Sequence, residues 1–188
     1  MDAPIKRVAE LDAGGSGATV VLLQADSALS RVAPILAGPF RVLRYAVDVT
    51  DAAQTGSASN ELAAAIAAQG SDPVGVVADT ATADVALALM AARPELVRAL
   101  ALIAPPIPKS ALAELKTPVL ALFGTRAMPP QVGRQMREVI PNCHVMLVYD
   151  ADSDMTNQRP EAVAAALREF MLSGDRFLVT GKSGKLYP

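Results

Sequence analysis

Residues 73–103 decide the fold, and they read Pro-Val-Gly-Val-Val-Ala-Asp-Thr-Ala-Thr-Ala-Asp-Val-Ala-Leu-Ala-Leu-Met-Ala-Ala-Arg-Pro-Glu-Leu-Val-Arg-Ala-Leu-Ala-Leu-Ile. Within them, Val74–Ala78 is a continuous apolar run, which is typical of a strand buried on both faces of a parallel sheet. Residues Thr82–Ala92 are apolar nearly all round, as in a helix buried against a sheet. A second strand is predicted at Ala99–Ala104. The order strand, helix, strand predicts two parallel strands joined by a right-handed crossover.

The same alternation continues on both sides of this unit. Strands are also predicted at Ile5–Leu11, Ala18–Leu23, Phe40–Val47, Val119–Phe123 and Val145–Tyr149, and helices at residues 59–68, Gln131–Val139 and Glu161–Leu172. This pattern predicts an α/β fold with a doubly wound, mostly parallel sheet. Helices are expected on both faces of the sheet, which gives a three-layer sandwich.

The 188 residues suit one domain of ordinary size. We expect a single domain over residues 1–172 and a C-terminal extension over residues 173–188. The extension is rich in Gly and Lys and contains the strand-like run Arg176–Thr180. It forms either an edge strand or an arm that packs on another subunit.

The composition limits the chemistry and the partners of the chain. Hydrophobic residues make up 52% of it and aromatic residues only 4%, which predicts an aliphatic core. Lys and Arg number 17 against 19 Asp and Glu, so we expect neither nucleic acid nor a membrane as a partner. Without a leader or a long apolar stretch, the chain is expected to be cytoplasmic. The single Cys excludes an internal disulfide and a Cys-rich zinc site.

Two glycine-rich stretches look like phosphate-binding loops, and neither fits that function. Gly14–Gly17 precedes a predicted strand, whereas a dinucleotide loop follows a strand and opens a helix, so a turn between two strands is predicted. In residues 174–183 the glycines are too far apart for a P-loop. We therefore expect no nucleotide cofactor, and no other cofactor or metal is indicated.

The central unit and its flanks resemble the α/β-hydrolase family. The likeness includes the corner Arg93-Pro94-Glu95-Leu96-Val97, which leads into the next strand. Residues 15–25 resemble the first central strand and its loop, residues 117–124 the strand before the acid loop, and residues 159–170 the closing helix. The resemblance covers most of residues 14–172. It implies a serine-hydrolase scaffold with a nucleophile, an acid and a base on three loops.

The family's catalytic groups are missing at every position where the resemblance implies them. The pentad Gly-x-Ser-x-Gly is Ala78-Asp79-Thr80-Ala81-Thr82 here, so the serine has become Thr80 and both glycines are gone. The acid position falls on Ala127 and the base position on Ser153. The family's His-Gly beside the oxyanion hole is replaced by Gln24-Ala25. This coordinated loss indicates a scaffold whose chemistry has been discarded.

The sequence therefore predicts a non-catalytic binding or accessory protein. Its expected partners are copies of itself or an active hydrolase subunit. A small-molecule ligand is also possible, with Gln24, Ala25, Thr80 and Ala81 as its predicted binding residues. The link over residues 105–115, with a short helix ending at Leu115, is too short for a helical cap. This leaves an open face where Ile107, Pro129 and Pro130 are expected to meet a partner.

The alternative is an active, esterase-like hydrolase in which Thr80 is the nucleophile. Asp79 or the loop acids Asp150, Asp152 and Asp154 would then serve as its base. This hypothesis predicts a Thr80 hydroxyl within hydrogen-bond reach of a carboxylate and facing two backbone N–H donors. A third hypothesis, a small-molecule receptor, requires a cavity above Thr80.

Other residues with reactive side chains are expected to be structural. His144, the only histidine, stands at the start of a predicted strand, opposite the edge where α/β sites form. Its neighbour Cys143 points to the other face of that strand, which argues against a Cys–His dyad. Asp150, Asp152 and Asp154 lack the glycine turn and closing Glu of a calcium loop, so a solvated acidic loop is expected.

Overall fold

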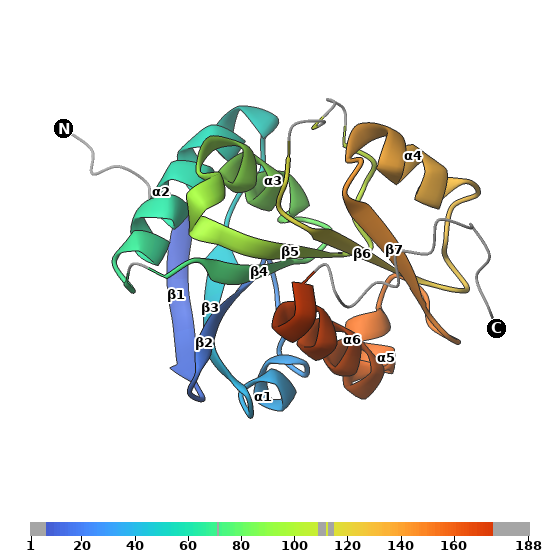
Figure 1. Ribbon diagram of the computed structural model, residues 1–188, viewed down its shortest axis with the longest axis horizontal. Helices are drawn as coiled ribbons and strands as arrows, with labels where there is room; N and C mark the ends of the chain where they lie inside the picture. The colour runs from blue at the N-terminus through green and yellow to red at the C-terminus, as the bar shows by residue number, and fades with distance from the viewer. Residues whose placement is uncertain (1–6, 71, 109–111, 113–114, 175–188) are drawn as a thin grey trace.

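The computed structural model describes residues 7–70, 72–108, 112 and 115–174, which form one seven-stranded sheet between two helical layers (Figure 1). The strands are β1 Val8–Gly14, β2 Ala18–Gln24, β3 Phe40–Val47, β4 Val74–Ala78, β5 Val97–Ile103, β6 Val119–Gly124 and β7 Cys143–Val148. Their order across the sheet is β1-β3-β2-β4-β5-β6-β7. The predicted α/β fold with a mostly parallel sheet is confirmed.

Strand direction and order define where the chain reverses its course across the sheet. Among the strands that the structure describes, only β1 runs antiparallel to its neighbour, β3, and every other pair is parallel. From β2 the chain moves outward to β3, and it then crosses back over β2 to reach β4. The carboxyl ends of β2 and β4 therefore diverge at a topological switch point, which is where ligands bind in open α/β sheets.

Helices cover both faces of the sheet (Figure 1). One layer contains α2 Thr55–Ala67, α3 Ala83–Ala92 and α4 Val132–Val139, and the other contains α1 Ala33–Leu36, α5 Met155–Gln158 and α6 Pro160–Ser173. Short 3₁₀ helices occur at Ala52–Gln54 and Pro94–Leu96. None of the described helices is both long and apolar enough to cross a membrane.

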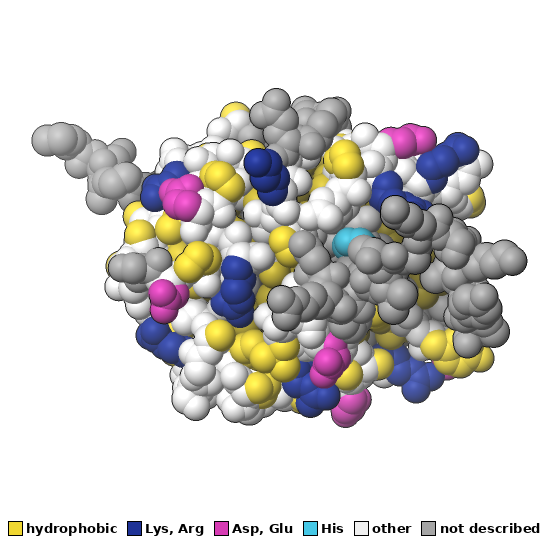
Figure 2. Space-filling view, in the orientation of Figure 1, with side chains coloured by type: hydrophobic (Ala, Val, Ile, Leu, Met, Phe, Trp, Pro, Cys, Tyr) yellow, Lys and Arg dark blue, Asp and Glu magenta, His cyan; other side chains and the backbone are white. Residues whose placement is uncertain are grey.

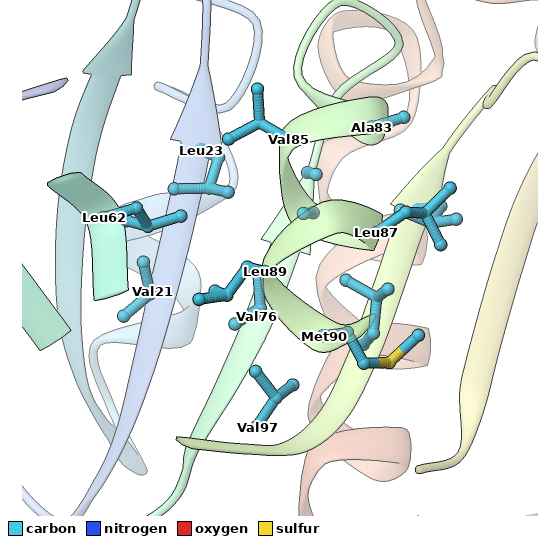
Figure 3. Packing of buried hydrophobic residues seen from close by; sticks show 14 of the residues in the cluster. Val21, Leu23, Leu62, Val76, Ala83, Val85, Leu87, Leu89, Met90 and Val97 are labelled. Atoms are coloured by element: carbon cyan, nitrogen blue, oxygen red, sulfur yellow. The ribbon is translucent and has the colours of Figure 1, made fainter. Parts of the chain in front are cut away.

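The core is aliphatic, as the composition predicts, and it consists of one cluster on each face of the sheet. Figure 3 shows Val85 of α3 beside Leu23 of β2, and Leu89 of α3 beside Val76 of β4. All of these side chains are almost completely buried. Burying a side chain of this size contributes about 1.5–3 kcal/mol, so the packing of α3 fixes β4 and the turn that follows it.

Several boundaries differ from the sequence prediction. Helix α2 begins at Thr55 rather than near Ser59, because Asp51 accepts a hydrogen bond from the Ala53 N–H (3.0 Å) and starts the helical turns earlier. The helices α1 and α5 were not predicted, since four residues are too few to show a helical period. The predicted helix ending at Leu115 and the strand-like run Arg176–Thr180 fall largely or wholly outside the described residues.

The predicted turn at Gly14–Gly17 joins β1 to β2 and has a specific requirement for glycine. Gly15 has a φ of 77°, in the left-handed region that favours glycine. A Cβ atom at this position would also overlap the carbonyl oxygens of Ala37 and Phe40. The glycines therefore serve close backbone packing.

Candidate functional site

The sheet brings the predicted site residues to one edge. Gln24 ends β2, Thr80 follows β4, Ala127 follows β6 and Ser153 follows β7. Because these four strands are parallel, their carboxyl ends share that edge. The resemblance therefore assigned the loops to the correct end of the sheet.

The Thr80 hydroxyl is directed at backbone carbonyls. Thr80 Oγ1 lies 3.1 Å from the carbonyl oxygen of Ile103 and 3.0 Å from that of Ala104, both at the end of β5. Thr80 is exposed and does not have a positive φ, so its backbone lacks the strain of a left-handed residue. Among the described residues, no carboxylate forms a hydrogen bond with this hydroxyl.

Asp79, the residue before Thr80, uses its carboxylate to tie β2 to the start of α3. The side chain is nearly buried, with 7% of the residue exposed. Its Oδ2 accepts a hydrogen bond from the Ala25 N–H (3.2 Å). Its Oδ1 accepts from the Thr82 N–H (2.9 Å) and the Thr82 hydroxyl (2.7 Å). Thr82 Oγ1 also lies 3.0 Å from the carbonyl oxygen of Leu23, so Asp79 and Thr82 bind the end of β2 together.

This arrangement places a negative charge where a catalytic site would bind one. The resemblance implies that the loop at Gln24-Ala25 forms one side of an oxyanion hole. Backbone N–H groups in such a hole must be available to the oxygen on which charge develops. Here the Ala25 N–H already donates to the Asp79 carboxylate. An internal anion thus uses the donor that a reacting substrate would need.

A cavity of about 340 Å³ opens beside this carboxylate. It is lined by Arg7, Ala9, Ala25, Ala46, Val47, Asp48, Val49, Thr50 and Ala81. Of the four predicted ligand-binding residues, Ala25 and Ala81 line the cavity, whereas Gln24 and Thr80 do not. Gln24 is 2% exposed, and its Oε1 has no hydrogen-bond partner among the described residues. The cavity lies mainly at the carboxyl end of β3, and Ala25 and Ala81 connect it to the loops after β2 and β4.

The other half of the edge, formed by the loops after β6 and β7, is held together by exposed ion pairs. Arg126 lies 2.8 Å from Asp150 Oδ1, and Arg159 lies 2.6 Å from Asp150 Oδ2. Arg126 also approaches Asp152 Oδ2 at 3.8 Å. The Gln158 side chain, the Asp154 backbone N–H and the Arg126 charge hold the pKa of Asp152 below its usual value. A carboxylate with a lowered pKa is a poor general base.

The acid and base positions carry no group that could replace a catalytic one. Ala127 is exposed, and its N–H donates to the carbonyl oxygen of Gly124 (3.1 Å). Ser153 is also exposed. A Cβ atom on Gly124 would overlap the carbonyl oxygens of Ala151 and Asp152, so the two loops pack closely at this point.

Cys143 and His144 lie at the start of β7, away from the site edge, as the sequence predicts. Cys143 is buried and His144 is half-buried, in agreement with side chains on opposite faces of the strand. Burial raises the pKa of the Cys143 thiol to about 12. A thiol of this kind is not a nucleophile at neutral pH.

No candidate metal centre is found in the described part of the chain. No three His, Cys, Asp or Glu side chains within it come together as metal ligands. Asp150 and Asp152 instead face arginines. Over the face seen in Figure 2, basic and acidic side chains are interspersed, and neither sign gathers into a broad patch.

Several solved structures similar to this one are named as hydrolases or esterases. An α/β-hydrolase enzyme, MGS-MChE2, from a lagoon-sediment metagenome of Mar Chica, Morocco, matches with a TM-score of 0.74 and 16% identity over 93% of this chain and 98% of that chain. Carboxylesterase CesB from Bacillus subtilis matches with a TM-score of 0.70 and 13% identity over 91% of this chain and 93% of that chain. Cfl2 from Burkholderia cenocepacia matches with a TM-score of 0.73 and 18% identity over 85% of this chain and 90% of that chain. This chain therefore has the α/β-hydrolase fold.

The sequence itself gives no closer relationship. No protein-family model matches it, and no curated protein matches it either. At identities of 18% or less, the solved structures establish the fold alone.

Proposed function

We propose that this chain is a non-catalytic α/β-hydrolase-fold protein that acts by binding at the carboxyl edge of its sheet. The observation that carries this proposal is the Asp79 carboxylate, which accepts hydrogen bonds from the Ala25 N–H and from Thr82. The Ala25 N–H, which the resemblance places beside the oxyanion hole, thus helps to hold the scaffold together instead.

The geometry of Thr80 supports the same proposal. A hydroxyl nucleophile needs a neighbouring base that can accept its proton as the bond to the substrate forms. The two groups that accept from Thr80 are the carbonyl oxygens of Ile103 and Ala104, which are far too weakly basic for this role. The adjacent carboxylate of Asp79 is directed to Ala25 and Thr82.

Two features suit this edge for binding. The cavity beside Ala25 and Ala81 is large enough for a small molecule. On the opposite half of the edge, large apolar side chains are exposed, with Met128 at 38% and Tyr149 at 83%. These two side chains would contribute apolar area if a protein partner covered this half of the edge. A second copy of the chain or an active hydrolase subunit would fit an accessory role.

The proposal is tested by ester hydrolysis with purified protein, using p-nitrophenyl acetate and butyrate. We expect wild type, Thr80→Ala and Thr117→Ala to show the same background rate. Thr117 is the matched control, because its hydroxyl also lies near a backbone carbonyl, that of Val97 (3.4 Å), but at the amino edge of the sheet. Repeated turnover by wild type that is lost in Thr80→Ala and kept in Thr117→Ala would contradict the proposal.

The alternative, an esterase-like enzyme with Thr80 as nucleophile, is favoured only by the activities of the solved neighbours. One of them is a carboxylesterase and another an epoxide hydrolase. An enzyme of this kind would require Asp79 to leave Ala25 and Thr82 and turn to Thr80. The ester assay described above decides between the two functions.

A further inference from the structure

The cavity at the carboxyl end of β3 is lined mainly by small aliphatic side chains. The apolar residues of its lining are Ala9, Ala25, Ala46, Val47, Val49 and Ala81. No aromatic side chain is among the described residues that line it. Its volume of about 340 Å³ lies at the lower end of the range for small-molecule sites. The lining therefore suits a small aliphatic ligand.

Several hydrogen-bond donors of the cavity wall are already engaged within the chain. The Ala25 N–H donates to the Asp79 carboxylate (3.2 Å), and the Asp48 N–H donates to a carbonyl oxygen next to β1 (2.9 Å). The Thr50 N–H donates to Gln54 Oε1 (3.2 Å), and the Thr50 hydroxyl lies 3.4 Å from the same oxygen. A ligand that accepts hydrogen bonds, such as a carboxylate, would have to compete for these donors.

The unsatisfied polar groups at and beside the cavity are acceptors. Asp48 lines the cavity, and within the described part of the chain its carboxylate forms no hydrogen bond or ion pair. Gln24 is the register partner of the lining residue Ala46, so it lies one strand away from the wall. Its Oε1 is buried and accepts no hydrogen bond from the described residues. A ligand that donates hydrogen bonds complements this arrangement.

The charges of the described residues around the cavity favour a cation. Asp79 and Glu61 accept hydrogen bonds from backbone N–H groups of two lining residues (3.2 and 2.8 Å). Asp26 and Asp51 each directly follow a lining residue in the chain. Arg7 is the one basic side chain among the described residues of the lining, and it confines a bound cation to the end where the wall carries a carboxylate. The surplus of carboxylates attracts a positively charged ligand.

Among organic cations, a primary ammonium fits these groups best. An ammonium group has three N–H donors and no acceptor, and its hydrogen bonds to a carboxylate are strengthened by charge. A quaternary ammonium has no N–H to donate and is recognised through the faces of aromatic rings. The described lining offers a carboxylate and aliphatic side chains rather than such rings.

We propose that this cavity binds a small aliphatic primary amine in its protonated form. The Asp48 carboxylate accepts hydrogen bonds from the ammonium group, and the alanine and valine side chains of the lining contact the alkyl chain. This inference rests on the proposed function, in which the carboxyl edge of the sheet binds a ligand, and it adds the chemical class of that ligand.

Titration of the full, ¹⁵N-labelled chain with pentylamine, followed by NMR at neutral pH, tests the proposal. We expect the amide signals of Ala25, Asp48 and Ala81 to shift, with a dissociation constant in the millimolar range for so small a ligand. The matched probes are 1-pentanol, pentanoate and pentyltrimethylammonium. Each should bind at least about tenfold more weakly, because the first lacks the charge, the second has the opposite charge and the third has no N–H.

Two variants test the part played by the cavity wall. Asp48→Asn keeps the size of the side chain and removes its charge, so it should weaken pentylammonium binding at least about tenfold. Asp84→Asn is the matched control, because Asp84 is an exposed carboxylate at the start of α3 that does not line the cavity. Ala81→Leu keeps every charge and places a larger side chain in the cavity, which should also weaken binding. The NMR spectrum of each variant shows whether it is folded.

Several results would overturn the inference. They are the absence of saturable shifts at tens of millimolar pentylamine, equal binding of pentanoate or 1-pentanol, and an unchanged affinity in folded Asp48→Asn. A chain that neither binds the amine nor hydrolyses esters would contradict this inference alone. A chain that binds pentylammonium and turns over esters through Thr80 would contradict only the proposed absence of catalysis.

Discussion

The two halves of the carboxyl edge keep their loops together in different ways. At β2 and β4, a nearly buried carboxylate, Asp79, accepts hydrogen bonds from two backbone N–H groups and one hydroxyl. At β6 and β7, Asp150 and Asp152 are exposed and pair with arginines. Hydrogen bonds to a buried charge are worth more than exposed ion pairs. We expect the hydrogen bonds of the first half to stabilise the fold strongly and the ion pairs of the second half to stabilise it only weakly.

The largest effect is expected for Asp79→Ala. This change leaves the N–H groups of Ala25 and Thr82 without their acceptor, so the free energy of unfolding should fall by about 3 kcal/mol. Asp79→Asn keeps one acceptor oxygen and should cost about half as much. Urea unfolding followed by circular dichroism measures both values. A loss below about 0.5 kcal/mol for Asp79→Ala would show that the two halves do not differ.

Removal of the Thr82 hydroxyl should have an intermediate effect. Thr82→Val keeps the shape of the side chain but takes away a donor to the Asp79 carboxylate (2.7 Å). We expect a loss of about 1.5 kcal/mol in the same urea experiment. Thr82→Ser retains the hydroxyl and should lose less. A loss in Thr82→Ser as large as that in Thr82→Val would contradict the prediction that the hydroxyl contributes more than the methyl group.

On the opposite half, Asp150→Asn should have a small effect that depends on salt. It weakens the ion pairs of Asp150 with Arg126 and Arg159. All three side chains are about half exposed. We expect a loss of at most about 1 kcal/mol at low salt and almost none near 1 M NaCl. Unfolding curves at two salt concentrations provide the comparison. A loss as large as that of Asp79→Ala, independent of salt, would overturn the distinction.

The smallest effect is the pH dependence contributed by Asp152. Because its pKa is lower in the folded chain than the ordinary value of 3.8, its contribution to stability is present above that value and is lost as the pH falls through the folded pKa. The stability difference between wild type and Asp152→Asn should therefore disappear on acidification below about pH 4. Urea unfolding at several pH values measures it. A stability difference between the two proteins that increases towards low pH would contradict this prediction.

Most of the fold could be predicted because buried parallel strands have a strong signature. The strands at Phe40–Val47 and Val74–Ala78 were predicted with the bounds that the structure shows. Strand β7 begins at Cys143, two residues before the predicted start at Val145, because the continuous apolar run begins only after His144. The short helix α1 carries no periodic signal.

The candidate site could be predicted only in part. The positions of Thr80, Ala127 and Ser153 at the sheet edge followed from the loops that the resemblance identified. The bond between Asp79 and Ala25 joins residues 54 positions apart and depends on β2 lying next to β4. The hydrogen bonds from Thr82 to Asp79 did have a local signal in the sequence. An Asp stands three residues before a Thr at the start of a helix, a spacing at which the Asp side chain can accept from the backbone.

If the proposed non-catalytic function holds, the Asp79 carboxylate also has a consequence for any attempt to give this scaffold esterase activity. Replacing Thr80 by serine alone would leave the Ala25 N–H donating to Asp79, so a second substitution at Asp79 would be required. That second change is the one expected to cost most stability. Under the proposed function, the path to an esterase therefore passes through a variant that is less stable than the parent, and a stabilised parent is the better starting point for such engineering.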